Sequence, residues 1–391
     1  MARMAYALLV ASAFLFELAL DLPVGSLPLA LDGDGASHGA VAAAMGSGMF
    51  AALLASLPLG VLVDRFGRLR IMRVSALAGA LSLLTLTFVH GAAGGSALLA
   101  LRGIAFIGYM TAEFAYAGDL ASPGRAVSTV ATLGMIGTLT FATAPALGIA
   151  LWQHGVGREQ FAWSAAVALA GAALLWALPA EPARRPHAAT PRMFRPEWLP
   201  AIAFGVTAVL QPGVNGSLAV LTFHDRGVAN GAALFSASAF TAFALRYAVG
   251  RLIERFGPRR FALGVVLAQL VAALLAARAQ TLAEVIVAGA LLGVGWAGGP
   301  PVMIALLFET TDERTRGAAM GAYNFASGSG AACGAVLATL ATLLGGGYAL
   351  AVTLAGVAPL AVLPFILSSK PPAEPPRVGD AVLFEALPVL E

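Results

Sequence analysis

Residues 60–70 have the sequence GVLVDRFGRLR, and residues 250–260 repeat the pattern as GRLIERFGPRR. Both copies contain a glycine, an acidic residue four positions later, and then Arg-Phe-Gly. Each copy follows a long apolar segment and occupies the same place in its half of the chain. The repeat therefore indicates a protein built from two similar halves.

The composition indicates that most of the chain lies in lipid. Of its 391 residues, 59% are hydrophobic and 11% are charged, whereas a soluble domain has about 25% charged residues. The apolar runs are close to the ~20 residues that a helix needs to cross ~30 Å of hydrocarbon. Breaks at Gly, Pro and charged residues predict twelve spans, at 5–31, 40–63, 71–90, 96–118, 127–152, 161–180, 198–222, 230–253, 261–277, 283–307, 317–343 and 347–367.

A polar segment rich in proline and arginine interrupts the apolar runs near the middle of the chain. Its composition forbids a membrane helix. We therefore expect an N-terminal six-helix bundle (1–180), a cytoplasmic linker (181–197), a C-terminal six-helix bundle (198–369) and a cytoplasmic tail (370–391).

The distribution of arginine predicts the orientation, because short loops rich in Arg or Lys stay in the cytoplasm. If the N-terminus is cytoplasmic, the outer loops hold only Arg158, Arg226 and Arg278. The inner loops then hold Arg65, Arg68, Arg70, Arg73, Arg125, Arg184, Arg185, Arg192, Arg195, Arg251, Arg255, Arg259, Arg260, Arg314 and Arg316. We expect a multi-pass protein of the inner (plasma) membrane with both termini in the cytoplasm.

With twelve spans, a central loop and the repeated motif, the chain resembles the major facilitator superfamily over essentially its whole length. The resemblance implies an all-α polytopic membrane protein with twelve transmembrane helices in two six-helix bundles. It also implies a secondary transporter that is not an enzyme and has no cofactor. In that family the motif loop latches the two bundles on the cytoplasmic side.

On that resemblance, the repeated motif is expected to gate the conformational change. Gly60 permits close helix approach, Asp64 can face a cation or a helix N-terminus, and Gly67 allows the turn between spans. The predicted gating residues are Gly60, Asp64, Arg65, Gly67, Arg68, Gly250, Glu254, Arg255 and Gly257.

Two partial motifs are similar to those of proton-coupled exporters. Arg102, followed by Gly103 and Gly108, is similar to the family's R-x-x-x-G-x-G segment, whose arginine is linked to proton transfer, although one of its glycines is missing. Ala144 to Gly148 is similar to the G-P-x-x-G-G motif of drug:proton antiporters, with Ala144 and Ile149 in place of two glycines. These similarities predict a bacterial-type proton-coupled exporter.

Ionisable residues inside the spans are costly and need a reason. Glu17 and Asp21 lie four residues apart, on one face of the first span. Two carboxylates in a low dielectric each disfavour the other's ionised form. Arg102 has a comparable depth. In the family that the chain resembles, spans one and four both line the central cavity, and on that resemblance Arg102 can pair with either acid. Glu113 lies further along the same side of span four. We predict proton coupling or substrate binding at these four residues; a static buried ion pair or a packing role is the alternative.

Other polar residues are weaker candidates for the substrate cavity. Gln211 and Asn215 flank Pro212 and Gly213, a combination that can break the helix and expose hydrogen-bonding groups. The remaining candidates are Arg246, Trp296, Tyr323 and Asn324. For each of them interhelical packing is the alternative. The histidines have no metal-ligand spacing, so we predict no metal site.

The leading functional hypothesis is a proton-coupled exporter of a small organic molecule by alternating access. An importer or facilitator of a small metabolite with the same fold is the second hypothesis, and a non-transporting membrane sensor is the third. The expected partners are a small-molecule substrate, protons and the lipid bilayer, with no nucleic acid. We expect the protein to be a monomer. An embedded enzyme has no support, because no nucleophile, metal or acid/base cluster lies outside the bundle.

Overall fold

The computed structural model describes residues 2–120, 126–179, 195–311 and 316–368, and every regular element in these ranges is helical. The first half contains α1 (Ala2–Gly33), α2 (His38–Phe66), α3 (Arg68–Leu86), α4 (Ala92–Leu120), α5 (Ala126–Gln153) and α6 (Glu159–Leu174). The second half contains η1 (Pro196–Trp198), α7 (Leu199–Val214), the π-helical η2 (Asn215–Ala219), α8 (Val220–Asp225), α9 (Ala233–Phe256), α10 (Pro258–Arg278), α11 (Leu282–Phe308), α12 (Arg316–Leu343) and α13 (Gly347–Ser368).

The helices agree with the predicted polytopic fold. Ten helical stretches of the described chain are long and apolar enough to cross a membrane, and one of these joins α7, η2 and α8. Helix α9 adds a span if its segments Ala233–Arg246 and Ala248–Phe256 are counted together. Helix α6, with 16 residues, is shorter than the ~20 residues of a standard span. Together these elements account for the twelve predicted spans.

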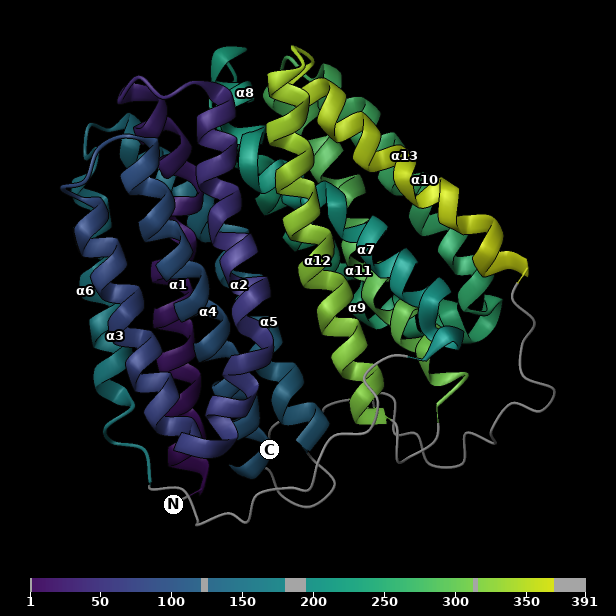
Figure 1. Ribbon diagram of the computed structural model, residues 1–391, viewed down its shortest axis with the longest axis horizontal. Coiled ribbons are helices and arrows are strands. Elements are labelled where there is room, and N and C mark those ends of the chain that lie inside the picture. The colour runs from purple at the N-terminus through teal and green to yellow at the C-terminus, as the bar shows by residue number, and fades with distance from the viewer. Residues whose placement is uncertain (1, 121–125, 180–194, 312–315, 369–391) are drawn as a thin grey trace.

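The helices of the two halves form two neighbouring groups (Figure 1). We call the end where α1 begins, which also carries Gly67 and Gly257, the motif end, and the opposite end, near α8, the far end. The two groups lie close together at the far end and diverge toward the motif end (Figure 1). The predicted linker lies almost wholly outside the described residues, and so does the predicted tail.

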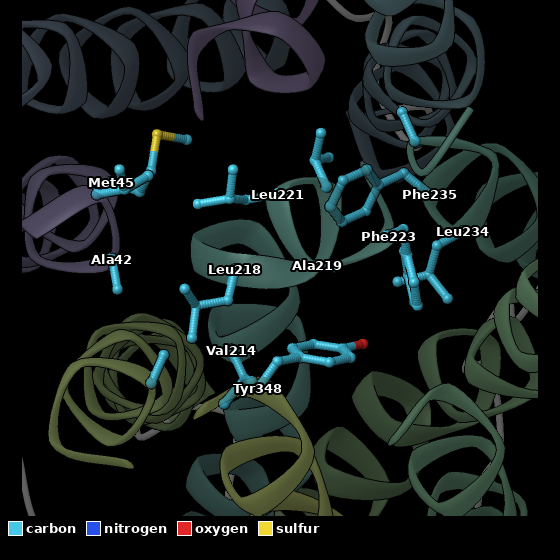
Figure 2. Close-up of a cluster of buried hydrophobic side chains, with 14 of the residues drawn as sticks. Ala42, Met45, Val214, Leu218, Ala219, Leu221, Phe223, Leu234, Phe235 and Tyr348 are labelled. Atoms are coloured by element: carbon cyan, nitrogen blue, oxygen red, sulfur yellow. The ribbon is translucent and has the colours of Figure 1, made fainter. Parts of the chain in front are cut away.

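Buried apolar side chains show the same asymmetry. One cluster combines residues of both halves, and Figure 2 shows Ala42 and Met45 of α2 beside the turn that carries Leu218 and Leu221. A second cluster lies entirely within residues 5–178, and a third lies entirely within residues 198–366. Since close side-chain packing holds membrane helices together, the shared cluster holds the two halves together at the far end.

The glycines of the repeated motif have two different environments. Gly67 and Gly257 have φ values of 91° and 77° and separate α2 from α3 and α9 from α10. Only glycine adopts such angles at low cost, so the turn predicted at Gly67 is confirmed. Gly60 and Gly250, in contrast, have no neighbouring atom where a Cβ would lie. The described residues therefore do not make the close approach expected at Gly60, and they form no buried core shared by the two halves at the motif end.

Glycines also bring α1 close to α5. A Cβ on Gly148 would overlap the carbonyl group of Leu22, and one on Gly25 would overlap the carbonyl group of Pro145. Small residues allow such close helix approach in membranes. The Ala144 to Gly148 segment therefore packs α5 directly against the helix that carries Glu17 and Asp21.

Candidate functional site

The two acidic residues of α1 lie near the middle of that helix. Leu20 belongs to the buried cluster of the N-terminal half, whereas Leu27 belongs to the cluster that joins both halves. Glu17 is 2% exposed, and Asp21 is half-buried. Both side chains contact α5, through Gly137 and Thr140 respectively.

Asp21 is held by groups from two other helices. The hydroxyl of Thr140 on α5 donates a 2.9 Å hydrogen bond to its Oδ2 atom. Arg102 of α4 donates from Nη2 to the carbonyl oxygen of Leu20, the residue before Asp21, and interacts electrostatically with the Asp21 carboxylate. The sequence analysis gave Glu17 and Asp21 as possible partners of Arg102, and the structure places Asp21 beside it.

Glu17 and Glu113 form a second acidic group. Glu113 of α4 is fully buried, and the two carboxylates interact electrostatically. In the described part of the chain, Glu17 Oε2 and both carboxylate oxygens of Glu113 have no hydrogen-bond partner. The nearby ring of Tyr109 stacks on Phe16 with 4.0 Å between the ring centroids. This acidic group is enclosed by protein and has no cationic partner among the described residues.

An aromatic contact joins the two halves through Phe141, the residue after Thr140. Phe141 of α5 packs edge-on against Trp296 of α11, with ring centroids 5.5 Å apart, and against Phe235 of α9 at 5.4 Å. Trp296 remains 37% exposed. Since Phe141 follows Thr140 directly, one short segment of α5 contacts both the acid of α1 and the aromatic residues of the other half.

Polar contacts between the halves lie further toward the far end. His38, at the start of α2, lies 3.4 Å from Asp225 of α8 and 3.8 Å from Asp32 of α1. The Asn230 side chain donates to the Ala146 carbonyl at 3.2 Å, and Gln153 donates to the carbonyl of Ala229. These contacts connect the two halves at the far end, and we call the line of contact at His38, Asp225, Gln153 and Asn230 the seam.

Two of the weaker cavity candidates point into the C-terminal half. The carboxamide of Gln211 faces the backbone of α10 at Gln269 and Ala273, within 3.3 Å. Asn215 accepts a 2.8 Å hydrogen bond from the hydroxyl of Tyr348 on α13. The helix break expected around Pro212 is not present, because α7 continues through the π-helical η2 into α8.

The other weaker candidates are spread over three helices. Trp296 is at the aromatic contact, and Arg246 is half-buried where the two segments of α9 meet. On α12, Tyr323 packs against the buried cluster of the C-terminal half and bonds to Ser327, while Asn324 is exposed. The structure therefore does not gather these residues into one group with Asp21.

The motif loops carry an ion pair in each half. Arg68 pairs with Asp119 at the end of α4 and donates to the Ala115 carbonyl at 2.6 Å. Arg259 donates from both terminal nitrogens to the Glu309 carboxylate, at 2.8 and 2.7 Å. The motif residues Asp64, Arg65, Glu254 and Arg255 are exposed in this conformation. Among the described residues, no three His, Cys, Asp or Glu side chains lie together as a metal site.

The family model described as Major Facilitator Superfamily matches residues 9–227 and, in a second match, residues 201–390. The chain belongs to the major facilitator superfamily. It is thus a multi-pass membrane protein of a transporter family and not an enzyme, and the fold of that family serves secondary transport by alternating access. No curated protein matches the chain.

Solved structures of other transporters have the same fold. The nucleoside transporter NupG matches with a TM-score of 0.77 and 13% identity, covering 94% of this chain and 100% of its own. A bacterial homolog of the human lysosomal transporter Spinster, in an inward-facing and unoccupied conformation, matches with a TM-score of 0.70 and 15% identity over 94% and 95%. The human organic anion transporter MFSD10 matches at 0.67 and 18% over 94% and 99%.

Within this major facilitator chain, sequence reasoning missed several residues that complete the site. Thr140 and Phe141 are ordinary residue types in an apolar span, so nothing in their spacing indicated contact with Asp21 or Trp296. The one available signal was position, because they lie between Gly137 and the Ala144 to Gly148 segment. Their roles depend on how α5 is placed against α1 and the second half.

Proposed function

We propose that this chain is a secondary active transporter that exports a small organic molecule in exchange for protons. The observation that carries the proposal is the contact of Asp21 with Thr140 and Arg102, halfway along α1. Charged residues inside membrane spans mark ion or substrate pathways. The similarity of Ala144 to Gly148 to a proton-antiporter motif supports exchange and export.

The proposed orientation places the motif end in the cytoplasm and the protein in the plasma membrane. The arginine-rich segments 65–73 and 251–260, which the structure describes, lie at the end where α1 begins, whereas Arg158, Arg226 and Arg278 lie at the opposite helix ends. Since positive loops stay inside, both termini are then cytoplasmic. In this orientation the shared buried core, which among the described residues lies at the far end, is on the outer side, and this supports an inward-facing state.

The proposed mechanism is competition between a proton and the substrate. When Asp21 is ionised, its charge is balanced by Arg102, and Thr140 donates to it. Protonation removes the negative charge and leaves Arg102 without compensation, which is costly in a low dielectric. The contacts among α1, α4 and α5 then change. In the competition proposed here, substrate binding displaces the proton. The proton and the substrate then favour different arrangements of the same helices, which is the requirement for coupled transport.

The test uses the purified chain in proteoliposomes with an imposed pH gradient. Candidate substrates come first from a thermal-shift screen. In wild-type protein, protons that move down their gradient should drive the substrate in the opposite direction across the membrane. Asp21→Asn should abolish this gradient-driven transport and retain substrate counterflow. Gradient-driven transport that survives in Asp21→Asn would overturn the assignment of Asp21.

The direction of transport distinguishes the remaining hypotheses. Substrate that accumulates together with protons would indicate an importer. Binding without counterflow of any compound would indicate a sensor. Molar mass measured by light scattering in detergent checks the expected monomer.

A further inference from the structure

Glu17 and Glu113 lie outside the contact of Asp21 with Arg102, and the mechanism above does not use them. Glu17 is 2% exposed and Glu113 is 0% exposed. Among the residues that the structure describes, none makes a hydrogen bond to Glu17 Oε2 or to either oxygen of Glu113. An unpartnered buried acceptor is expensive and needs an explanation.

Within the described parts of the neighbouring helices, no positive charge lies beside this pair. On α1 the neighbouring acid is Asp21, and on α4 the neighbouring titratable group is Tyr109, whose hydroxyl lies 2.8 Å from the Ser12 hydroxyl. Ser12 in turn donates to the Gly171 carbonyl of α6.

The described part of α5 has no charged residue. The only charged residue of α6 is Glu159 at its first position, and the arginines of α3 lie at the motif end.

Arg102 does not supply the missing positive charge beside Glu17 and Glu113. Its guanidinium donates to the Leu20 carbonyl and interacts with Asp21. The charges acting on Glu17 are those of Glu113 and Asp21, which are both acidic. Two ionised carboxylates would therefore repel each other with no counter-ion beside them among the described residues, which costs several kcal/mol per uncompensated ion.

One bound proton removes the repulsion between two ionised carboxylates. A proton on either carboxyl group leaves the pair with a single negative charge and adds an O–H donor to a group of buried oxygens that otherwise can only accept. The proton is transferred from a hydronium ion of the surrounding water: one O–H bond of that ion breaks, one carboxyl O–H bond forms, and a water molecule is released. We propose that Glu17 and Glu113 form one proton-binding pair between α1 and α4, separate from the site at Asp21.

The proton pair also has a physical connection to α5. A Cβ on Gly137 would lie 3.0 Å from Glu17 Oε2, so the carboxyl group is packed directly against this helix. The following turn of α5 carries Thr140 and Phe141, which contact Asp21 and the aromatic residues of the other half. Proton release from the pair would therefore alter the packing of the helix that joins the two halves. This coupling role rests on the proposed function, whereas the presence of the proton does not.

Infrared spectroscopy tests the proton directly, without any substrate. Purified wild-type protein in lipid should show the C=O stretch of a protonated carboxylic acid at neutral pH. Selective ¹³C labelling of glutamate should shift that band, and this experiment requires no variant. Glu17→Gln and Glu113→Gln should each remove the band, while Asp21→Asn should retain it. A band that does not respond to labelling, or that survives in both glutamate variants, would overturn the pair.

Proton stoichiometry tests the coupling role. Each single variant should retain substrate counterflow and move one proton fewer per substrate than wild type. The double variant should match the single variants, because the residues share one proton, whereas independent sites would give additive losses. Unchanged stoichiometry in both single variants would remove the pair from the coupling mechanism. If wild type shows no proton-coupled transport at all, the proposed function fails while the infrared result still stands.

Discussion

The hydroxyl of Thr140 donates a 2.9 Å hydrogen bond to Asp21, so a carboxyl group of α1 is held by a side chain of α5. The next residue, Phe141, packs against Trp296 and Phe235 of the other half. Adjacent residues on a helix point in different directions, about 100° apart. A movement of α5 that follows a change at Asp21 is therefore transmitted to the contact between the halves.

Thr140→Val should impair proton coupling, because valine has nearly the same shape but donates no hydrogen bond to Asp21. Hydrogen bonds to charged groups contribute about 1.5–3 kcal/mol, so gradient-driven transport is expected to fall by about tenfold or more. Proteoliposome assays measure this, with counterflow as the reference activity.

Thr138→Val is the matched control, since the Thr138 hydroxyl donates to the Gly134 carbonyl of its own helix. Thr140→Ser should restore coupling because it restores the donor. Equal losses in Thr138→Val and Thr140→Val would show that the bond to Asp21 is not the cause.

Phe141→Ala should shift the protein away from the conformation in which the far end is closed. The variant loses two edge-to-face contacts, each worth about 0.5–1.5 kcal/mol in addition to buried area. Spin labels at the exposed residues His154 and His224, in a Cys333→Ser background, report the distance between the halves. We expect a larger population of long distances.

Phe240→Ala is the control for Phe141→Ala, because Phe240 is 53% exposed. It removes an aromatic ring without removing one of the contacts described between the halves. Identical distance distributions for wild type and Phe141→Ala would contradict a gating role of this contact.

His38→Ala should have a smaller effect on the same distance measurement. His38 bridges Asp32 and Asp225 across the seam, but its side chain is 45% exposed and that of Asp225 is 42% exposed. Exposed ion pairs contribute about 0–1 kcal/mol, so the populations should change by roughly fivefold at most. A shift larger than that of Phe141→Ala would identify His38 as the main contact of the seam.

The sequence was sufficient for the fold because each span carries its own apolar signal, and because the motif at Gly60 recurs at Gly250. The spacing of Glu17 and Asp21 also placed both acids on one helix face.

Contacts between distant spans have no such local signal. Asn215 bonds to Tyr348, which lies 133 residues away. Thr140 reaches Asp21 because Gly148 lets α5 approach α1 closely.

Arg259→Lys should weaken the C-terminal half. Arg259 binds both oxygens of Glu309, and this two-pronged geometry requires a planar guanidinium that lysine lacks. Both side chains are largely buried, at 18% and 23% exposure, so screening by solvent is limited. The melting temperature in detergent should fall by a few degrees, and Glu309→Gln should have a similar effect. The exposed Arg260 provides the control: Arg260→Lys should leave the melting temperature unchanged.

Gly148→Ala should destabilise the protein more than Gly137→Ala. The added methyl group at residue 148 meets the backbone carbonyl of Leu22, which cannot move unless α1 and α5 separate. At residue 137 it meets the end of the Glu17 side chain at 3.0 Å, which can rotate away. Overpacking in a well-packed region costs about 1–3 kcal/mol, so only the first change should lower the melting temperature clearly. Gly137→Ala should instead alter proton coupling, because it displaces the Glu17 carboxyl group. The reverse order of the two effects would contradict the packing described for α1 and α5.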